Sequence, residues 1–103
     1  MEEGLDTGDM LTTVTCKIDA TETAQSLHDK LAQLSVGPLL TTLSHLERRL
    51  SRRLAQDNEQ ATYAPKIKKE QAKINWQLTA AAIECQIRAY NPWPISYTML
   101  GTE

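Results

Sequence analysis

The chain has 103 residues, of which 41% are hydrophobic and 23% charged, the composition of a globular protein with room for one small core. Its formal net charge of -2 gives no overall attraction to nucleic acid or to an anionic membrane, so contact with either must depend on local charge. No apolar run approaches the roughly 20 residues that span a bilayer, and the acidic start lacks the features of a signal peptide. We therefore expect a cytoplasmic protein without membrane contact.

The two cysteines exclude the common cysteine-based sites. Cys16 and Cys85 stand far apart in the chain, without a C-x-x-C spacing or a neighbouring histidine pattern. Neither a zinc site nor a disulfide framework follows from such a pair. We expect no metal, and we expect both thiols to behave as small hydrophobic side chains.

The first half of the chain predicts one strand and two helices. Apolar and polar residues alternate from Met10 to Ile18, which is typical of a half-buried strand. Leucines at helical spacing then predict a helix up to Leu34, with Thr21 or Thr23 as its N-cap. Residues 35–38 are expected to interrupt it, because proline disfavours a helix interior.

Leucines at spacings of three and four residues predict a second helix from Pro38 to Leu54. A helix would place four arginines of its polar face on one side, where they form a basic ridge. The ridge consists of Arg48, Arg49, Arg52 and Arg53.

The second half begins with a polar segment and returns to short regular elements. The polar segment AQDNEQATYAPK, residues 55–66, is predicted to be a linker, because Pro65 excludes both a regular helix and a central strand. A short strand is expected at 72–76, and an amphipathic helix from Ala81 to Tyr90 that Asn91 and Pro92 terminate. Residues 95–100 are expected to form a strand that enters a turn at Gly101.

Three stretches occur in the order found in one enzyme family. They read GLDTGDML, TYAPKIKKEQAKINW and IRAYNPWPISYT. Together with the intervening LHDKLAQL and the leucine-rich helix, they resemble the methionyl-tRNA formyltransferases over essentially the whole chain. Related formyltransferases share the DTG-type loop, while the NPWP stretch favours the tRNA-directed branch.

The resemblance implies a helix-rich α+β fragment that takes part in two domains. Residues 1–55 would form the C-terminal part of a Rossmann-like formyltransferase domain. Residues 56–64 would be the linker, and residues 65–103 the N-terminal part of an OB-like C-terminal domain. We expect such a chain to pack poorly alone and to need the N-terminal part of the catalytic domain, because an edge strand without neighbours leaves apolar surface uncovered.

The resemblance also implies an activity and a site. The family transfers a formyl group from 10-formyltetrahydrofolate to the amino group of methionine on initiator tRNA, without a metal. Asp6 matches the family's catalytic aspartate, and Gly4, Leu5 and Asp6 match the loop that lines the folate pocket. From the residues alone, Asp6 also fits a turn-forming aspartate that caps local N–H groups.

The family's second catalytic element, Asn-x-His, does not occur in the chain, and neither His28 nor His45 stands in that context. Whether the chain is an enzyme therefore stays open, and we expect it to be inactive alone.

Four lysines after the linker are the candidates for contact with tRNA phosphates, a role that the resemblance supports. They are Lys66, Lys68, Lys69 and Lys73. The alternative for each is a solvated surface charge. Trp76 and Trp93 could stack on unpaired bases, although packing is the more common use of such rings. The competing hypothesis for the whole chain is a non-enzymatic helical module that binds RNA or protein.

Overall fold

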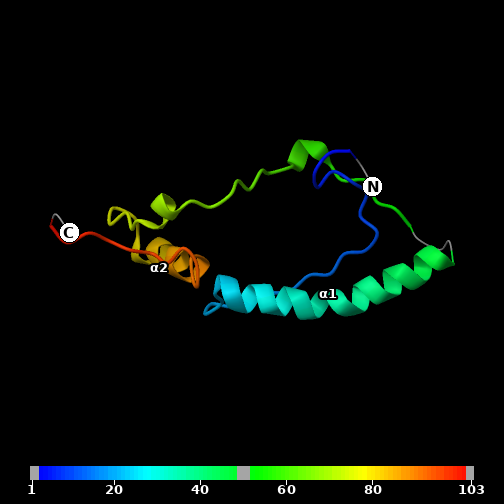
Figure 1. Ribbon diagram of the computed structural model, residues 1–103, viewed down its shortest axis with the longest axis horizontal. Helices are drawn as coiled ribbons and strands as arrows, with labels where there is room; N and C mark the ends of the chain where they lie inside the picture. The colour runs from blue at the N-terminus through cyan, green and yellow to red at the C-terminus, as the bar shows by residue number, and fades with distance from the viewer. Residues whose placement is uncertain (1–2, 49–51, 102–103) are drawn as a thin grey trace. The chain divides into compact units, whose positions relative to one another are not determined.

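The computed structural model, drawn in Figure 1, describes residues 3–48 and 52–101. Its internal contacts divide the chain into two compact units. Unit 1 consists of residues 1–16 and 31–64, and unit 2 of residues 17–30 and 65–103. Their α-helices are α1 (Ala24–Glu47) and α2 (Ala80–Ala89), and two short 3-10 turns, η1 (Asn58–Gln60) and η2 (Lys69–Ala72), interrupt the remaining chain.

Thr23, one of the two expected N-caps, directly precedes the first residue of α1. Its hydroxyl accepts from the backbone N–H of Ser26 at 3.1 Å, while the Ser26 hydroxyl accepts from the N–H of Thr23 at 3.0 Å. This reciprocal pair satisfies two N–H groups that the first helical turn leaves without a backbone partner.

The predicted interruption at residues 35–38 is wrong, because α1 continues through Gly37 and Pro38 as one helix of 24 residues. Proline removes one N–H donor from the helix interior, so the Leu34 carbonyl loses its helical partner. A long helix with apolar residues in phase on both sides of the proline accommodates that local loss.

The second helix does not reach Leu54, because α1 ends at Glu47. Arg48 lies in a turn, and Arg52 and Arg53 lie in irregular chain, so these three form no helical ridge. Like charges four residues apart, such as Arg48 and Arg52, oppose a helix at this point. Arg49 and Leu50 lie outside the described residues.

The predicted strand at residues 10–18 is also wrong. Only Met10 pairs, in an isolated antiparallel bridge with Leu54 whose two N–H···O distances are 2.8 and 2.9 Å. The residues that follow run as irregular chain up to the turn at Ala20. A strand needs a neighbour for its hydrogen bonds, and this segment has one pairing residue within the described chain.

The predicted helix near Ala81 is confirmed by α2. Thr79 caps it, with its hydroxyl accepting from the N–H of Ala82 at 3.2 Å. A turn follows at residues 90–94, where the Ile95 N–H donates to the Tyr90 carbonyl at 2.9 Å. Gly101 turns the chain with a φ of 68°, as expected of a glycine that ends an element.

The strands expected at 72–76 and 95–100 shrink to one parallel bridge between Lys73 and Tyr97. The Tyr97 N–H donates to the Ala72 carbonyl at 3.0 Å, and the Ile74 N–H donates to the Tyr97 carbonyl at 2.8 Å. Within residues 3–48 and 52–101 the fold is therefore helix-rich without a β-strand, and the α+β expectation holds for its helical part alone.

Little apolar surface is buried. Among the described residues, Ala72 is the one hydrophobic residue that is completely buried. The solvent-accessible area is 9395 Å², whereas two separate globular proteins of this unit size would together expose about 7,000 Å². The expectation of poor packing is thereby confirmed. Exposed leucine and valine side chains of α1 are Leu31, Val36, Leu39, Leu40, Leu43 and Leu46.

Neither described helix is long and apolar enough to cross a bilayer. Both thiols are free, Cys16 half-buried and Cys85 exposed. Over the described ranges no three acidic, histidine or cysteine side chains gather as they would around a metal ion.

Candidate functional site

The glycine-rich loop at residues 4–10 carries the predicted catalytic carboxylate. Asp6 adopts a φ of 54°, in the left-handed region where aspartate is tolerated better than most residues. A Cβ at position 4 would lie 2.8 Å from the Thr7 hydroxyl oxygen, so another residue there would require the Thr7 side chain to shift. The loop is exposed except at Gly8 and Met10, which are half-buried.

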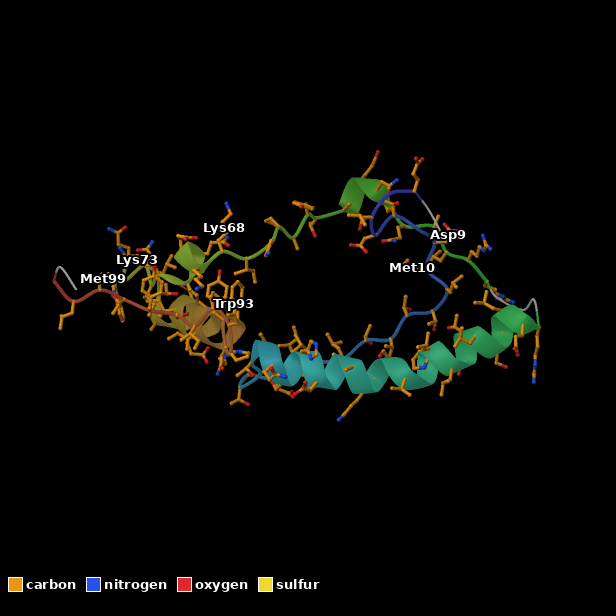
Figure 2. All side chains as sticks on the ribbon, in the orientation of Figure 1. Asp9, Met10, Lys68, Lys73, Trp93 and Met99 are labelled. Carbon is orange, nitrogen blue, oxygen red and sulfur yellow. The ribbon has the colours of Figure 1, made fainter. Side chains whose placement is uncertain are left out.

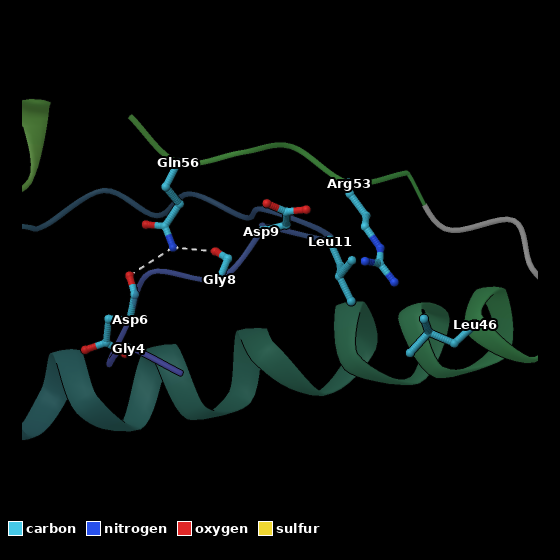
Figure 3. Close-up of a pocket in the computed structure, with 8 residues that line it drawn as sticks. All are labelled: Gly4, Asp6, Gly8, Asp9, Leu11, Leu46, Arg53 and Gln56. Atoms are coloured by element: carbon cyan, nitrogen blue, oxygen red, sulfur yellow. Dashed lines mark hydrogen bonds between the residues drawn. The ribbon is translucent and has the colours of Figure 1, made fainter. Parts of the chain in front are cut away.

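Gln56, about fifty positions further along the chain, is hydrogen-bonded to this loop. Its side-chain Nε2 donates to the Asp6 carbonyl at 3.0 Å and to the Gly8 carbonyl at 2.6 Å (Figure 3). Sequence reasoning assigned Gln56 to the linker and missed this contact. A single exposed glutamine gives no signal in the sequence that distinguishes it from a solvated side chain.

A pocket of about 550 Å³ lies in unit 1 at the loop, within the size range of small-molecule sites. Figure 3 shows the residues that line it, among them both aspartates of the loop and one arginine from the chain after α1. The lining residues are Gly4, Asp6, Gly8, Asp9, Leu11, Leu46, Arg53 and Gln56. Of the predicted folate loop, Gly4 and Asp6 therefore reach the pocket, whereas Leu5 is 93% exposed and is not among its lining residues.

The four predicted tRNA-binding lysines lie in unit 2 and are all exposed. Lys66 and Lys68 precede η2, Lys69 begins it, and Lys73 follows it. Figure 2 labels Lys68 and Lys73 on this segment. The ion pairs of the described residues involve other side chains, and Glu70 is the one acidic residue between the lysines. The segment therefore presents a locally positive surface.

Several hydrogen bonds hold the backbone of this lysine segment, residues 66–73. The Lys68 N–H donates to the Gln71 side chain at 2.6 Å, and Gln86 of α2 donates from Nε2 to the carbonyls of Gln71 and Lys73 at 3.2 and 3.5 Å. Ala72 is buried, and its carbonyl accepts from Tyr97. The lysine side chains thus project from a backbone that is fixed at several points.

The two tryptophans both belong to unit 2. Trp76 is 66% exposed, and its Nε1 donates to the Thr98 hydroxyl at 2.9 Å. Together with Ile83 and Ile87 of α2 it lines an apolar pocket of about 440 Å³. Trp93, labelled in Figure 2, is half exposed. Both rings have free surface, and the choice between packing and base stacking stays a prediction.

A polar cluster joins the start of α1 to α2 within unit 2. The Arg88 guanidinium donates to both Glu84 oxygens and, at 2.8 Å, to the backbone carbonyl of Glu22. The Glu22 carboxylate is 8% exposed and accepts from Lys30 and Ser26, and the Lys30 ammonium lowers its pKa below the ordinary value. Glu22 in turn raises the pKa of Lys30.

The Arg88 guanidinium likewise lowers the pKa of Glu84. These charges therefore serve the packing of unit 2, and none belongs to the loop pocket.

Residues 66–103 match the family model described as formyl transferase, C-terminal domain. The chain is 52% identical over 101 residues to the methionyl-tRNA formyltransferase of Legionella pneumophila strain Paris, and 48% identical over 101 residues to that of Pseudoalteromonas translucida strain TAC 125. Each alignment covers 98% of this chain and 32% of the relative. The chain matches part of a methionyl-tRNA formyltransferase.

The predicted resemblance is confirmed by these alignments, which include the Asp6 loop and the lysine segment. The chain spans about a third of the length of these relatives. The alternative of a non-enzymatic helical module is not favoured, and its basic helical ridge does not form among the described arginines.

Proposed function

We propose that this chain contributes to formyl transfer from 10-formyltetrahydrofolate to the amino group of methionine on initiator tRNA. The observation that carries the proposal is the alignment with methionyl-tRNA formyltransferases over 98% of the chain, which spans both the Asp6 loop and the lysine segment. The pocket beside Asp6 is large enough for part of a folate, and its two carboxylates and one guanidinium can accept from and donate to a polar ring system.

Asp6 would act on the proton that the reaction must move. The methionine nitrogen attacks the formyl carbon and forms a tetrahedral oxyanion, the bond to the folate nitrogen then breaks, and the amine proton passes finally to that nitrogen. A carboxylate near the attacking amine accepts or orients this proton. The oxyanion needs hydrogen-bond donors, which the Asn-x-His element of the family would supply. Because that element does not occur in the chain, we expect the chain alone not to catalyse the transfer.

The proposed domain plan follows the resemblance. Residues 1–55 would belong to a Rossmann-like catalytic domain, residues 56–64 to the linker, and residues 65–103 to the start of an OB-like domain in a cytoplasmic enzyme. Support comes from the family match at residues 66–103 and from the exposed chain at 56–64. The uncovered leucines of α1 fit a helix whose apolar side is completed by the N-terminal part of the catalytic domain.

Lys66, Lys68, Lys69 and Lys73 would neutralise phosphates of the tRNA. Such contacts release counterions, so the slope of log affinity against log salt falls by roughly 0.9 for each phosphate contact. Replacing the four lysines with glutamine should therefore flatten the slope by about 3 to 4 in a fluorescence-anisotropy titration of tRNA with the 103-residue chain. A matched variant with Arg48, Arg52 and Arg53 replaced by glutamine should keep most of the slope. Equal loss in both variants would contradict the assignment to the lysines.

An exchange enzyme tests the formyl transfer itself. In this exchange enzyme, the 103 residues of the chain replace the aligned segment of the Legionella pneumophila strain Paris formyltransferase. Its initial rate of methionyl-tRNA formylation should lie within about tenfold of the parent, and Asp6→Asn should lower the rate by at least a hundredfold, the range of general acid–base catalysis. Glu59→Gln, at an exposed carboxylate that does not line the pocket, is the control and should keep the rate. An active Asp6→Asn enzyme would overturn the proposed role.

A further inference from the structure

The side chain of Gln56 spans from the predicted linker to two carbonyls of the Asp6 loop, and nothing in the sequence pattern or the family match gives it a role. We infer that Gln56 is a positioning residue, which fixes the conformation of the loop and thereby the place of the Asp6 carboxylate. The inference rests on the proposed function for its consequence in catalysis. The contact itself belongs to unit 1 and stands apart from that function.

The contact uses both hydrogens that a primary amide can donate. One NH2 group has two hydrogens, and here each has an acceptor, the Asp6 carbonyl at 3.0 Å and the Gly8 carbonyl at 2.6 Å. Both distances lie within the range of ordinary or short N–H···O bonds. Thr7 lies between Asp6 and Gly8 in the chain, so the Gln56 amide is hydrogen-bonded to the backbone before and after Thr7 (Figure 3).

The loop depends on this bridge because it has few other restraints. Asp6 stands at a φ of 54°, a conformation that L-residues populate sparsely unless the surroundings fix it. Among the described residues, the backbone hydrogen bonds that join the loop to the rest of unit 1 are those of the Met10–Leu54 bridge, at the end of the loop. Gln56, which lies two residues after Leu54 in the chain, is hydrogen-bonded to the loop at Asp6 itself.

The arrangement gives residues 54–56 a second task. They lie where the chain enters the predicted linker of residues 56–64, whose first residue is Gln56, and they bind the loop through one side chain and one backbone bridge. A movement of this segment would therefore change the loop that carries Asp6. Gln56 links the chain that leads toward the lysine segment to the predicted catalytic carboxylate.

Backbone 15N relaxation of residues 5–9 tests the inference on the full 103-residue chain, because it needs neither substrate nor activity. In the natural sequence we expect order parameters near 0.8 for these amides. Gln56→Met keeps the length of the side chain and removes both donors, so the order parameters should fall below about 0.6. Gln60→Met is the matched control, since the Gln60 side chain donates to Asp57 and, within the described residues, forms no hydrogen bond with the loop.

Gln56→Glu adds a signature that a general loss of packing would not give. At pH 7 the carboxylate has no hydrogen to donate and repels both carbonyls, so the loop should be as mobile as in Gln56→Met. Below its pKa, ordinarily about 4.3, the protonated acid can donate one hydrogen bond and should restore part of the order. Neither Gln56→Met nor Gln60→Glu should show this recovery.

Two results would overturn the inference: unchanged order parameters in Gln56→Met, or a Gln56→Glu loop that does not respond to pH differently from Gln60→Glu. An inactive exchange enzyme with an ordered, Gln56-dependent loop would refute the proposed function and leave the positioning role standing.

Discussion

The Asp6 loop and the lysine segment present their proposed functional side chains in different ways. Both are irregular chain, and in each a glutamine side chain donates to two backbone carbonyls. The loop relies on shorter bonds from Gln56, at 3.0 and 2.6 Å, and on the Met10–Leu54 backbone bridge, which is its one backbone bridge over residues 3–48 and 52–101. The lysine segment receives longer bonds from Gln86, but the buried Ala72 also holds it, as do the backbone bond from Tyr97 to the Ala72 carbonyl and the bond from the adjacent Ile74 to Tyr97.

This difference suits the two proposed tasks. Phosphate contacts act over several ångströms and tolerate side-chain movement, so the lysines need only a fixed backbone. Proton transfer requires atoms within hydrogen-bond reach, so the position of Asp6 matters on a finer scale. The more demanding task therefore falls to the loop with fewer restraints, which explains why a single residue such as Gln56 has a large expected effect there.

The largest expected change in stability comes from Pro38→Ala in unit 1. Alanine restores the N–H that can donate to the Leu34 carbonyl and removes a residue that costs about 3 kcal/mol in a helix interior. We expect α1 to gain up to this amount, partly offset by the greater freedom of the unfolded chain. Circular dichroism at 222 nm should show a more resistant helix on heating. A less helical variant would contradict the continuous α1.

Ala72→Leu should loosen the lysine segment. Ala72 is fully buried, and added methylene groups in a packed site cost about 1–3 kcal/mol. Both tryptophans lie in unit 2, so the denaturation midpoint followed by their fluorescence reports on this unit. Ala89→Leu, at an exposed position of α2, should leave the midpoint nearly unchanged. Equal shifts in the two variants would show that the burial of Ala72 does not restrain the segment.

Gln86→Met sharpens the comparison between the two glutamines. It removes the donors to Gln71 and Lys73, at a net cost of about 0.5–1.5 kcal/mol per lost hydrogen bond. Because other contacts remain, the order parameters of residues 68–73 should fall less than those of residues 5–9 fall in Gln56→Met. A larger fall in the lysine segment would reverse the account of which region has more restraints.

The smallest effect concerns pH. Lys30 lowers the pKa of Glu22 below its ordinary value of 4.5, so the folded state favours the charged carboxylate. This contribution to stability is present above pH 4.5 and is lost as the pH falls through the lower pKa of the folded protein. Glu22→Gln should therefore narrow the difference in thermal midpoint between pH 7 and pH 3. If Glu22→Gln shows the same difference in thermal midpoint as the natural sequence, Glu22 is not the source of this pH-dependent stability.

Local signals predicted part of this fold, and contacts between distant residues account for the rest. The caps at Thr23, the helix at α2 and the turn at Gly101 depend on neighbouring residues, so the sequence indicated them. The strand at 10–18 failed because alternation predicts a strand only where a partner strand exists. The helix break at Pro38 failed because one proline costs less than the surrounding helical turns contribute.

The site shows the same division. A family resemblance led to the proposal of Asp6 and the lysines as site residues, since their motifs are short and contiguous. Gln56 went unnoticed, because its partners lie about fifty residues away and a side-chain amide has no sequence pattern of its own.

Steady-state kinetics of the exchange enzyme test the central claim most directly, that the two regions serve one reaction in different ways. Asp6→Asn should lower kcat for formylation with little change in the KM for methionyl-tRNA, because the carboxylate acts in the transition state. Replacing Lys66, Lys68, Lys69 and Lys73 with glutamine should raise that KM and leave kcat nearly unchanged. The same pattern of change in kcat and KM in both variants, or full activity of Asp6→Asn, would contradict the account.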